Sequence, residues 1–192
     1  MQGTEARILN NALQHFCSFG YNGTSVREIT SASHVTKPTL YYYFKNKEEL
    51  FIKLANYCFS LVLNEIEKCL GGEKDFKSSL SALFQCMNGV SMQDPAALKF
   101  IYSVIVAPQR GTPEVGAKEF MVKLNQLVQG IVERAIQQGE CDPLKKEGIL
   151  VMVSALLGLY SKCVITSGIV ETSTMDMDRV IETLAHCAAK HH

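Results

Sequence analysis

Residues 24–50 read TSVREITSASHVTKPTLYYYFKNKEEL, and this stretch decides the fold because it predicts two short helices separated by a tight turn. Ser25 and Glu28 form an S-x-x-E capping box, which starts the first helix. Thr36 can cap the second helix, in which Pro38 occupies the first turn, where its missing N–H costs no hydrogen bond. The stretch therefore predicts a compact helical pair with a defined start for each helix.

The second helix of this pair predicts a surface for an anionic partner. Leu40 and Phe44 fall on one side of it at 100° per residue, so we expect them to pack against the first helix. A soluble protein gains little by exposing consecutive aromatic residues, yet residues 41–43 are three tyrosines. The net charge of the chain is zero, but residues 20–47 carry four cations against Glu28 alone: Arg27, Lys37, Lys45 and Lys47. The major groove of DNA is both anionic and flat-edged, which suits this surface.

Three segments of the same region resemble the TetR family of DNA-binding regulators: residues 26–29 (VREI), 35–44 (VTKPTLYYYF) and 45–50 (KNKEEL). The resemblance is dense over about the first 50 residues and beyond them rests on chain length and helical patterning. The family usually has glycine in the turn where this chain has His34. Histidine is enriched among non-glycine residues at positive φ, so we expect His34 to adopt that conformation.

This resemblance implies a DNA-binding domain at residues 1–46 and a ligand-binding and dimerisation domain at residues 47–190. Lys37 and Thr39 are the candidates for contacts with base edges, with Tyr41 as a third. The family pattern implies phosphate contacts by Tyr42, Tyr43 and Lys47. The complete predicted DNA-binding set is Thr24, Arg27, Thr36, Lys37, Thr39, Tyr41, Tyr42, Tyr43 and Lys47. The alternative is a helical hairpin whose tyrosines are half-buried packing residues.

The rest of the chain predicts helices only. A helix over residues 8–19 should end at Gly20, and Asn46 should cap a long helix that Gly71 stops. Further helices are predicted from Asp75, Asp94, Pro113 or Glu114, Asp142 and Thr174, the one from Asp142 reaching about Gly168. With no strand-like alternation, the fold class is all-α with about nine helices.

The helix predicted after Asp142 has no polar face over most of its length, so it should be buried all round. Small residues at Ser154, Gly158 and Ser161 would let another helix approach closely. The TetR resemblance implies that the last two helices pair across a two-fold axis, so we expect a homodimer. The alternative is that both helices fill the core of a monomer.

Large and adaptable apolar residues are spread over the middle helices. As a set they predict an apolar cavity for an unknown small molecule, although each one alone is equally a core residue. The resemblance implies an inducer pocket in this part of the chain. The predicted ligand-binding residues are Phe59, Leu63, Phe84, Met87, Tyr102, Phe120, Met152 and Tyr160.

Other classes of function find little support. The 192 residues are 47% apolar, enough for a real core, and the strongly apolar run at residues 148–161 is too short to cross a bilayer. Without a signal peptide we expect a cytoplasmic protein. The seven cysteines contain no C-x-x-C, and no motif indicates a metal site, a cofactor or a catalytic residue, so we do not expect an enzyme.

The predicted function is a ligand-responsive transcriptional regulator. We expect it to be a repressor that a small apolar or amphipathic molecule releases from an inverted-repeat operator in double-stranded DNA. Two alternatives stay open: a helical small-molecule carrier, which leaves the tyrosine and lysine face unexplained, and a thiol-sensing regulator, which needs an exposed cysteine of low pKa.

Overall fold

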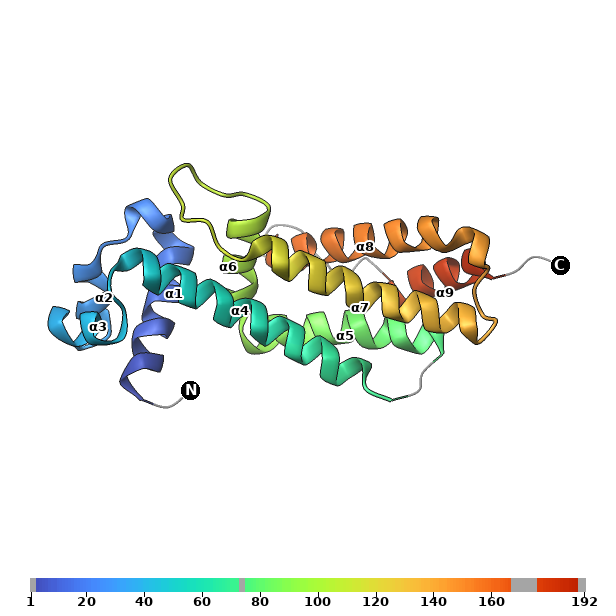
Figure 1. The fold of residues 1–192 in the computed structure, drawn as a ribbon, viewed down its shortest axis with the longest axis horizontal. Coiled ribbons are helices and arrows are strands. Elements are labelled where there is room, and N and C mark those ends of the chain that lie inside the picture. The colour runs from blue at the N-terminus through green and yellow to red at the C-terminus, as the bar shows by residue number, and fades with distance from the viewer. Residues whose placement is uncertain (1–2, 73–74, 167–175, 190–192) are drawn as a thin grey trace. The chain divides into compact units, whose positions relative to one another are not determined.

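The computed structural model describes residues 3–72, 75–166 and 176–189, and these form nine α-helices and one short 3-10 helix without a strand (Figure 1). The all-α prediction is confirmed. By their internal contacts the residues fall into two compact units, one of residues 1–61 and 94–118 and one of residues 62–93 and 119–192. Contacts and not function define these units, so the functional boundary between residues 46 and 47 stays a prediction.

The first unit is built around α1, which packs against α2, α3 and α6. The helices of this unit are α1 (Thr4–Gly23), α2 (Val26–Ala32), α3 (Lys37–Tyr43), the first part of α4 (Lys47–Leu70) and α6 (Pro95–Ile105). Asp94 caps α6, because its carboxylate accepts a hydrogen bond from the N–H of Ala97 at 3.1 Å. Asn46 caps α4 in the same way, through the N–H of Glu49 at 2.8 Å, as the sequence predicts.

Four aromatic rings form the core of the first unit. Phe51 of α4 lies edge-on to Phe16 at 4.9 Å, to Tyr21 at 5.0 Å and to Phe100 at 5.0 Å between ring centroids. Edge-to-face pairs of this kind contribute beyond their buried area. Phe100 belongs to α6 and lies 49 residues after Phe51, so a helix from a later part of the chain completes the core of the N-terminal helices.

Gly20 interrupts α1 near its end with φ 69° and ψ 179°, so the regular helix stops where the sequence predicts. The side chain of Gln109, from the segment after α6, packs directly over this glycine and occupies the place of a Cβ. Asn22 Nδ2 also donates a hydrogen bond to the carbonyl of Arg110 at 2.8 Å. The segment after α6 is therefore fastened to the turn between α1 and α2.

The second unit has α5 packed against α8 and α9. Its helices are α5 (Phe76–Gln93), α7 (Ala117–Gln137), the 3-10 helix (Pro143–Lys145), α8 (Lys146–Thr166) and α9 (Met177–Ala188), with the C-terminal part of α4. Two predicted starts differ: α7 begins at Ala117, after Pro113 and Glu114, and a single 3-10 turn separates Asp142 from α8. The predicted bounds at Gly168 and Thr174 lie outside the described residues.

One face of α8 is buried and the opposite face is bare within the chain. Ile149 and Val153 are fully buried, whereas Val151 is 68% exposed and Leu159 is 54% exposed. Gly158 lies on the bare face, with no atom within 4 Å of a Cβ added there. Contrary to the prediction from the sequence, helix α8 is thus not buried on all sides within this chain, because the other helices of the chain cover only one of its faces.

Candidate nucleic-acid interface

The capping box at the start of α2 forms as its sequence predicts. The N–H and the hydroxyl of Ser25 donate to the Glu28 carboxylate at 2.8 and 2.7 Å, and the N–H of Glu28 donates back to Ser25 Oγ at 3.2 Å. These hydrogen bonds from Ser25 hold the pKa of Glu28 below its ordinary value, so the carboxylate stays ionised at neutral pH. The box fixes where α2 begins relative to α1.

The turn between α2 and α3 depends on His34, which has φ 50° and is the one non-glycine residue at positive φ in the described part of the chain. Its N–H donates to the carbonyl of Ser31 at 3.1 Å, and the N–H of Val35 donates to the carbonyl of Thr30 at 3.0 Å. The prediction of a positive φ at His34 is confirmed. Residues that carry a Cβ are strained at positive φ.

Replacing His34 with glycine is expected to stabilise the protein by up to about 1 kcal/mol, because relief of this strain exceeds the added entropy of the unfolded chain. Urea unfolding measures the difference. Ser31→Gly, on the exposed side of α2, is the matched control and should destabilise by about 0.5 kcal/mol. A loss of stability in His34→Gly would contradict the account of strain.

The sequence of α3 separates a buried side from an outward one. Leu40 is fully buried and Phe44, just after the helix, is almost so, which anchors α3 on the core. Thr36 caps the helix by accepting from the N–H of Thr39 at 3.3 Å, and the two threonine hydroxyls lie 2.8 Å apart. This cap and the first-turn Pro38 set the direction in which the outward side chains leave the helix.

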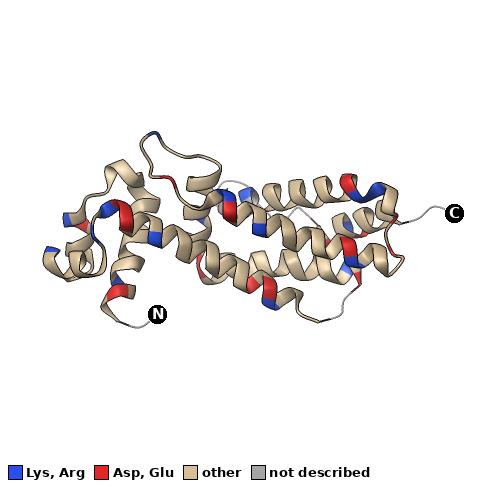
Figure 2. Ribbon diagram, in the orientation of Figure 1, with Lys and Arg blue, Asp and Glu red and all other residues tan. Residues whose placement is uncertain are grey.

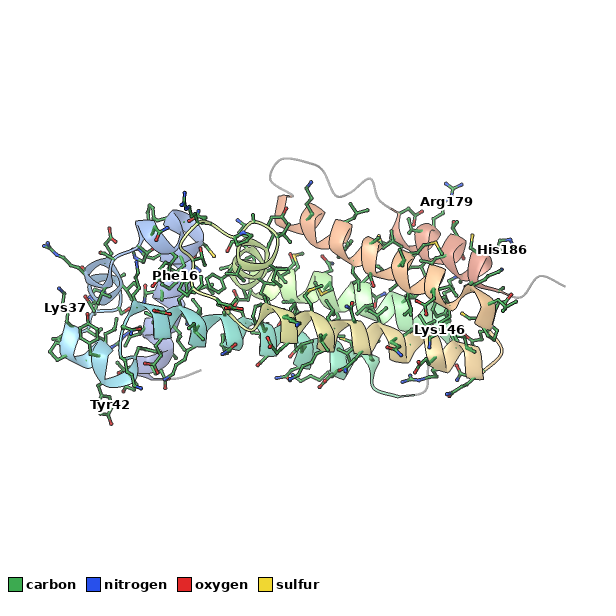
Figure 3. All side chains as sticks on the ribbon, turned by 45° about the horizontal axis from the view of Figure 1, so that its top comes forward. Phe16, Lys37, Tyr42, Lys146, Arg179 and His186 are labelled. Atoms are coloured by element: carbon green, nitrogen blue, oxygen red, sulfur yellow. The ribbon has the colours of Figure 1, made fainter. Side chains whose placement is uncertain are left out.

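Lys37, Tyr41 and Tyr42 form the outward surface of α3. Tyr42 is 83% exposed and Tyr41 48% exposed, which is unusual for large aromatic residues without a partner. Figure 3 shows Lys37 and Tyr42 pointing away from the ribbon, whereas Phe16 lies among the helices. Tyr43 is half-buried and stacks edge-on to Tyr42 with ring centroids 5.1 Å apart. We call Lys37, Thr39, Tyr41, Tyr42 and Tyr43 the α3 surface.

Cations flank the α3 surface. Arg27 of α2 and Lys45, between α3 and α4, are both exposed. Figure 2 shows Lys and Arg residues on α2, on α3 and at the start of α4, where the acidic residues are Glu28, Glu48 and Glu49. Glu49 is partly neutralised, since it accepts from the N–H of Lys45 at 2.7 Å and pairs with Lys53 at 3.5 Å. The exposed tyrosines and the flanking cations together suit a partner that is a polyanion with planar groups.

Thr24 and Lys47, two of the predicted DNA-binding residues, hold the domain together. Thr24 is only 2% exposed, and its hydroxyl donates to the carbonyl of Gly20 at 2.8 Å. The ammonium of Lys47 donates to the carbonyls of Tyr21 and Thr24 at 2.9 and 3.0 Å and lies 4.2 Å from the centre of the Tyr21 ring. Both side chains therefore secure the turn between α1 and α2.

Replacing Lys47 with methionine is expected to destabilise the protein by about 1 to 2 kcal/mol, because two carbonyls lose a charged donor. The free energy of unfolding in urea checks this. Lys45→Met is the control, since its exposed side chain should matter by less than about 0.5 kcal/mol. Equal stability of the two variants would show that the Lys47 hydrogen bonds contribute nothing.

The predicted ligand-binding residues are divided between the two compact units. Phe59 and Tyr102 belong to the first unit and the other six to the second. Phe84 and Tyr160 meet edge-on at 5.4 Å between ring centroids, while Met152 lies on the bare face of α8, 41% exposed. Two hollows of the described chain, near Cys86 and near Phe16, are lined by other residues. A ligand site at the eight residues stays a prediction.

Sequence reasoning missed the attachment of Gln109 and Arg110 to the turn at Gly20. These residues are about 90 positions apart in the chain, and nothing in their local pattern indicates a partner.

Among the described residues no group of three His, Cys, Asp or Glu side chains is placed to hold a metal ion. Within the same residues no helix combines the length and apolar character needed to cross a membrane.

Comparison with known proteins supports this interpretation of the N-terminal region. Residues 8–54 match the profile of the bacterial regulatory proteins, tetR family. The chain is 29% identical over 98 residues to the biofilm operon icaADBC HTH-type negative transcriptional regulator IcaR of Staphylococcus epidermidis, covering 51% of this chain and 45% of that protein. It is 33% identical over 89 residues to the uncharacterised HTH-type regulator YuxN of Bacillus subtilis, covering 44% and 31%. The match thus spans less than half the length of these relatives.

Solved structures show the same fold along nearly the whole chain. A bacterial regulatory protein in the tetR family from Rhodococcus RHA1 is similar with a TM-score of 0.76 at 16% identity, covering 100% of both chains. The transcriptional regulator FadR from Bacillus subtilis, solved in complex with stearoyl-CoA, is similar with a TM-score of 0.69 at 18% identity, covering 97% of this chain and 99% of that one. At such identity the similarity concerns the fold alone.

Proposed function

We propose that this chain is a transcriptional repressor of the tetR family that binds double-stranded DNA through the α3 surface, because residues 8–54 match the profile of that family. The observation that carries the proposal is the exposure of Lys37, Tyr41 and Tyr42 on a helix whose other side is anchored by Leu40. Lys37 and Thr39, at the start of α3, contact base edges, and Tyr41 joins them. The negative regulator IcaR supports repression as the direction of control.

Phosphate contacts surround the base-reading residues in this proposal. Arg27, Thr36, Tyr42 and Tyr43 offer donors around α3 to the backbone of the DNA. An ammonium has three N–H donors, and the Lys47 carbonyl bonds use two, which leaves one for a phosphate near the start of α4. Thr24 acts from inside the domain, by fixing the turn that positions α2.

Two copies of the chain pair through the bare face of α8 and through α9. Val151, Met152 and Leu159 present a contiguous apolar stripe that a monomer would leave in water, and the exposed Ser154 and Gly158 allow close approach. The side chain of Ser161 lies outside the described residues. A two-fold dimer presents two α3 surfaces to one duplex, so the operator is an inverted repeat.

Selection of bound genomic fragments by the purified protein tests DNA recognition. We expect the recovered fragments to share an inverted repeat whose half-sites lie about 34 to 36 Å apart, or a multiple of that spacing. Removal of one half-site should abolish tight binding. Recovery of fragments without a shared sequence, bound as tightly as random DNA, would refute the proposal of an operator.

An apolar or amphipathic small molecule controls the repressor in this proposal. The complex of FadR with stearoyl-CoA, an amphipathic compound, supports this class of ligand for a protein of the same fold. Phe84 and Tyr160 in the second unit are candidate wall residues because they already form an aromatic pair. The ligand acts only if its affinity differs between the DNA-bound and free conformations.

Linkage supplies the test of ligand control, because a ligand that weakens operator binding must itself bind more weakly when operator is present. We expect a coupling of about 1 to 3 kcal/mol, which is a 5- to 150-fold change in affinity in both directions. A metabolite library is screened by thermal shift, and each hit is titrated with and without operator DNA. Identical affinities in both titrations would exclude that compound as an inducer.

A further inference from the structure

A groove of about 390 Å³ lies in the second compact unit, where the end of α4 runs beside the middle of α5. Cys69 of α4 and Cys86 of α5 both line this groove, and their thiols are hydrogen-bonded to each other. Cys69 is half-buried and accessible from the groove, while Cys86 is buried. Two thiols from different helices thus meet at an opening to solvent, with Glu65 and Gln85 on the same walls.

We propose that Cys69 and Cys86 form a site of reversible oxidation, at which a hydroperoxide converts the two thiols into a disulfide. The site is independent of DNA binding, since both residues lie outside the α3 surface and its flanking cations. The cysteine pair of the first unit differs, because Cys58 is fully buried and the thiol of its half-buried neighbour Cys17 donates to the carbonyl of Ala96.

The two cysteines have distinct parts in the reaction. The sulfur of Cys69, reached through the groove, attacks the peroxide, breaks the O–O bond and becomes a sulfenic acid, while the thiol proton leaves with the other oxygen as an alcohol or as water. The Cys86 sulfur then attacks Cys69 Sγ, so that the S–S bond forms, the S–O bond breaks, and the hydroxyl group leaves as water with the Cys86 proton. In sum two thiols lose two hydrogen atoms and the hydroperoxide is reduced.

The environment of Cys86 assigns it the second step. Burial, and then the hydrogen bond with Cys69, raise the pKa of the Cys86 thiol to about 12, so it stays protonated and does not attack peroxide first. The proximity of Cys86 to Cys69 compensates for this low reactivity, because the sulfenic acid forms on Cys69 next to the Cys86 sulfur. Closing the bond requires the sulfurs to move from hydrogen-bonding distance to about 2 Å.

Peptide mapping of the full chain tests the site directly. Trypsin cleaves after Lys68, Lys74, Lys77 and Lys99, so Cys69 and Cys86 fall on separate peptides, residues 69–74 and 78–99. After treatment of the folded protein with hydrogen peroxide, we expect these two peptides to be recovered as one disulfide-linked species, lighter by two hydrogen atoms. Dithiothreitol should separate them again.

Single variants distinguish this pair from random thiol oxidation. Cys69→Ser and Cys86→Ser should each abolish the linked species, and Cys86→Ser should leave a sulfenic acid on peptide 69–74 that dimedone traps. Cys187→Ser is the matched control, because it removes an exposed cysteine and should leave the linkage unchanged. Recovery of peptide 69–74 unlinked, or linked mainly to another cysteine, in the unmodified protein would overturn the proposal whether or not any variant folds.

Discussion

Replacing Gly158 with aspartate is expected to convert the proposed dimer into monomers while leaving the fold of each chain intact. Within one chain Gly158 is exposed, and a new Cβ meets no atom within 4 Å, so the substitution introduces no clash. In the proposed dimer the carboxylate would be buried against an apolar helix without a partner, at a cost of about 3 to 5 kcal/mol.

Sedimentation at several protein concentrations measures this result, and circular dichroism verifies that the helices persist. Gly130→Asp is the matched control, because Gly130 is an exposed glycine of α7 that likewise has open space at its Cβ and should leave the dimer unchanged. A stable monomer in the unmodified protein, or a dimer in Gly158→Asp with the same dissociation constant, would contradict an interface at α8.

The second large effect is expected for Lys37→Ala, which should weaken operator binding by about 2 to 6 kcal/mol in the dimer, since each base contact contributes about 1 to 3 kcal/mol. Lys37 is exposed at the first position of α3, and the packing of Leu40 does not depend on it. The loss should be much smaller on a scrambled duplex of the same length, because a base contact matters only where its base is present.

Fluorescence anisotropy with both duplexes at one salt concentration separates these contributions. Lys45→Ala removes the same charge beside α3 and serves as the control, since a phosphate contact should weaken both duplexes alike. If Lys37→Ala lowers affinity for operator and scrambled DNA by the same factor, Lys37 reads no base and its role is electrostatic only.

The fold of residues 24–50 could be predicted from the sequence because the signals that determine it are local. The capping box of Ser25 and Glu28, the Thr36 cap and the positive φ of His34 each depend on residues within a few positions of one another. Periodicity correctly placed Leu40 inside and Tyr42 outside. Helices α4 and α6 start directly after the capping residues Asn46 and Asp94, and Asp142 caps the 3-10 turn that precedes α8.

The parts that sequence could not supply depend on distant contacts. Lys47 reads as a cation at the surface, but two of its three ammonium donors bind the carbonyls of Tyr21 and Thr24, which only the fold brings near. Phe100 joins the aromatic core of the N-terminal helices although it lies 49 residues after Phe51. A pattern of apolar residues likewise does not distinguish a cavity wall, a packed core and an exposed apolar face, and Met152 of the predicted ligand set is 41% exposed within this chain.

The turn between α1 and α2 has a consequence for the opening motions of the native protein. Its carbonyls at Gly20, Tyr21 and Thr24 are bound by the side chains of Thr24 and Lys47, and Asn22 is fastened to Arg110. Separating α1 from α2 therefore requires these attachments to be released together, although the turn itself has only a few residues. In amide hydrogen exchange, the end of α1 and the start of α2 should open as one cooperative unit, with equal free energies of opening, and not fray residue by residue as a surface turn does.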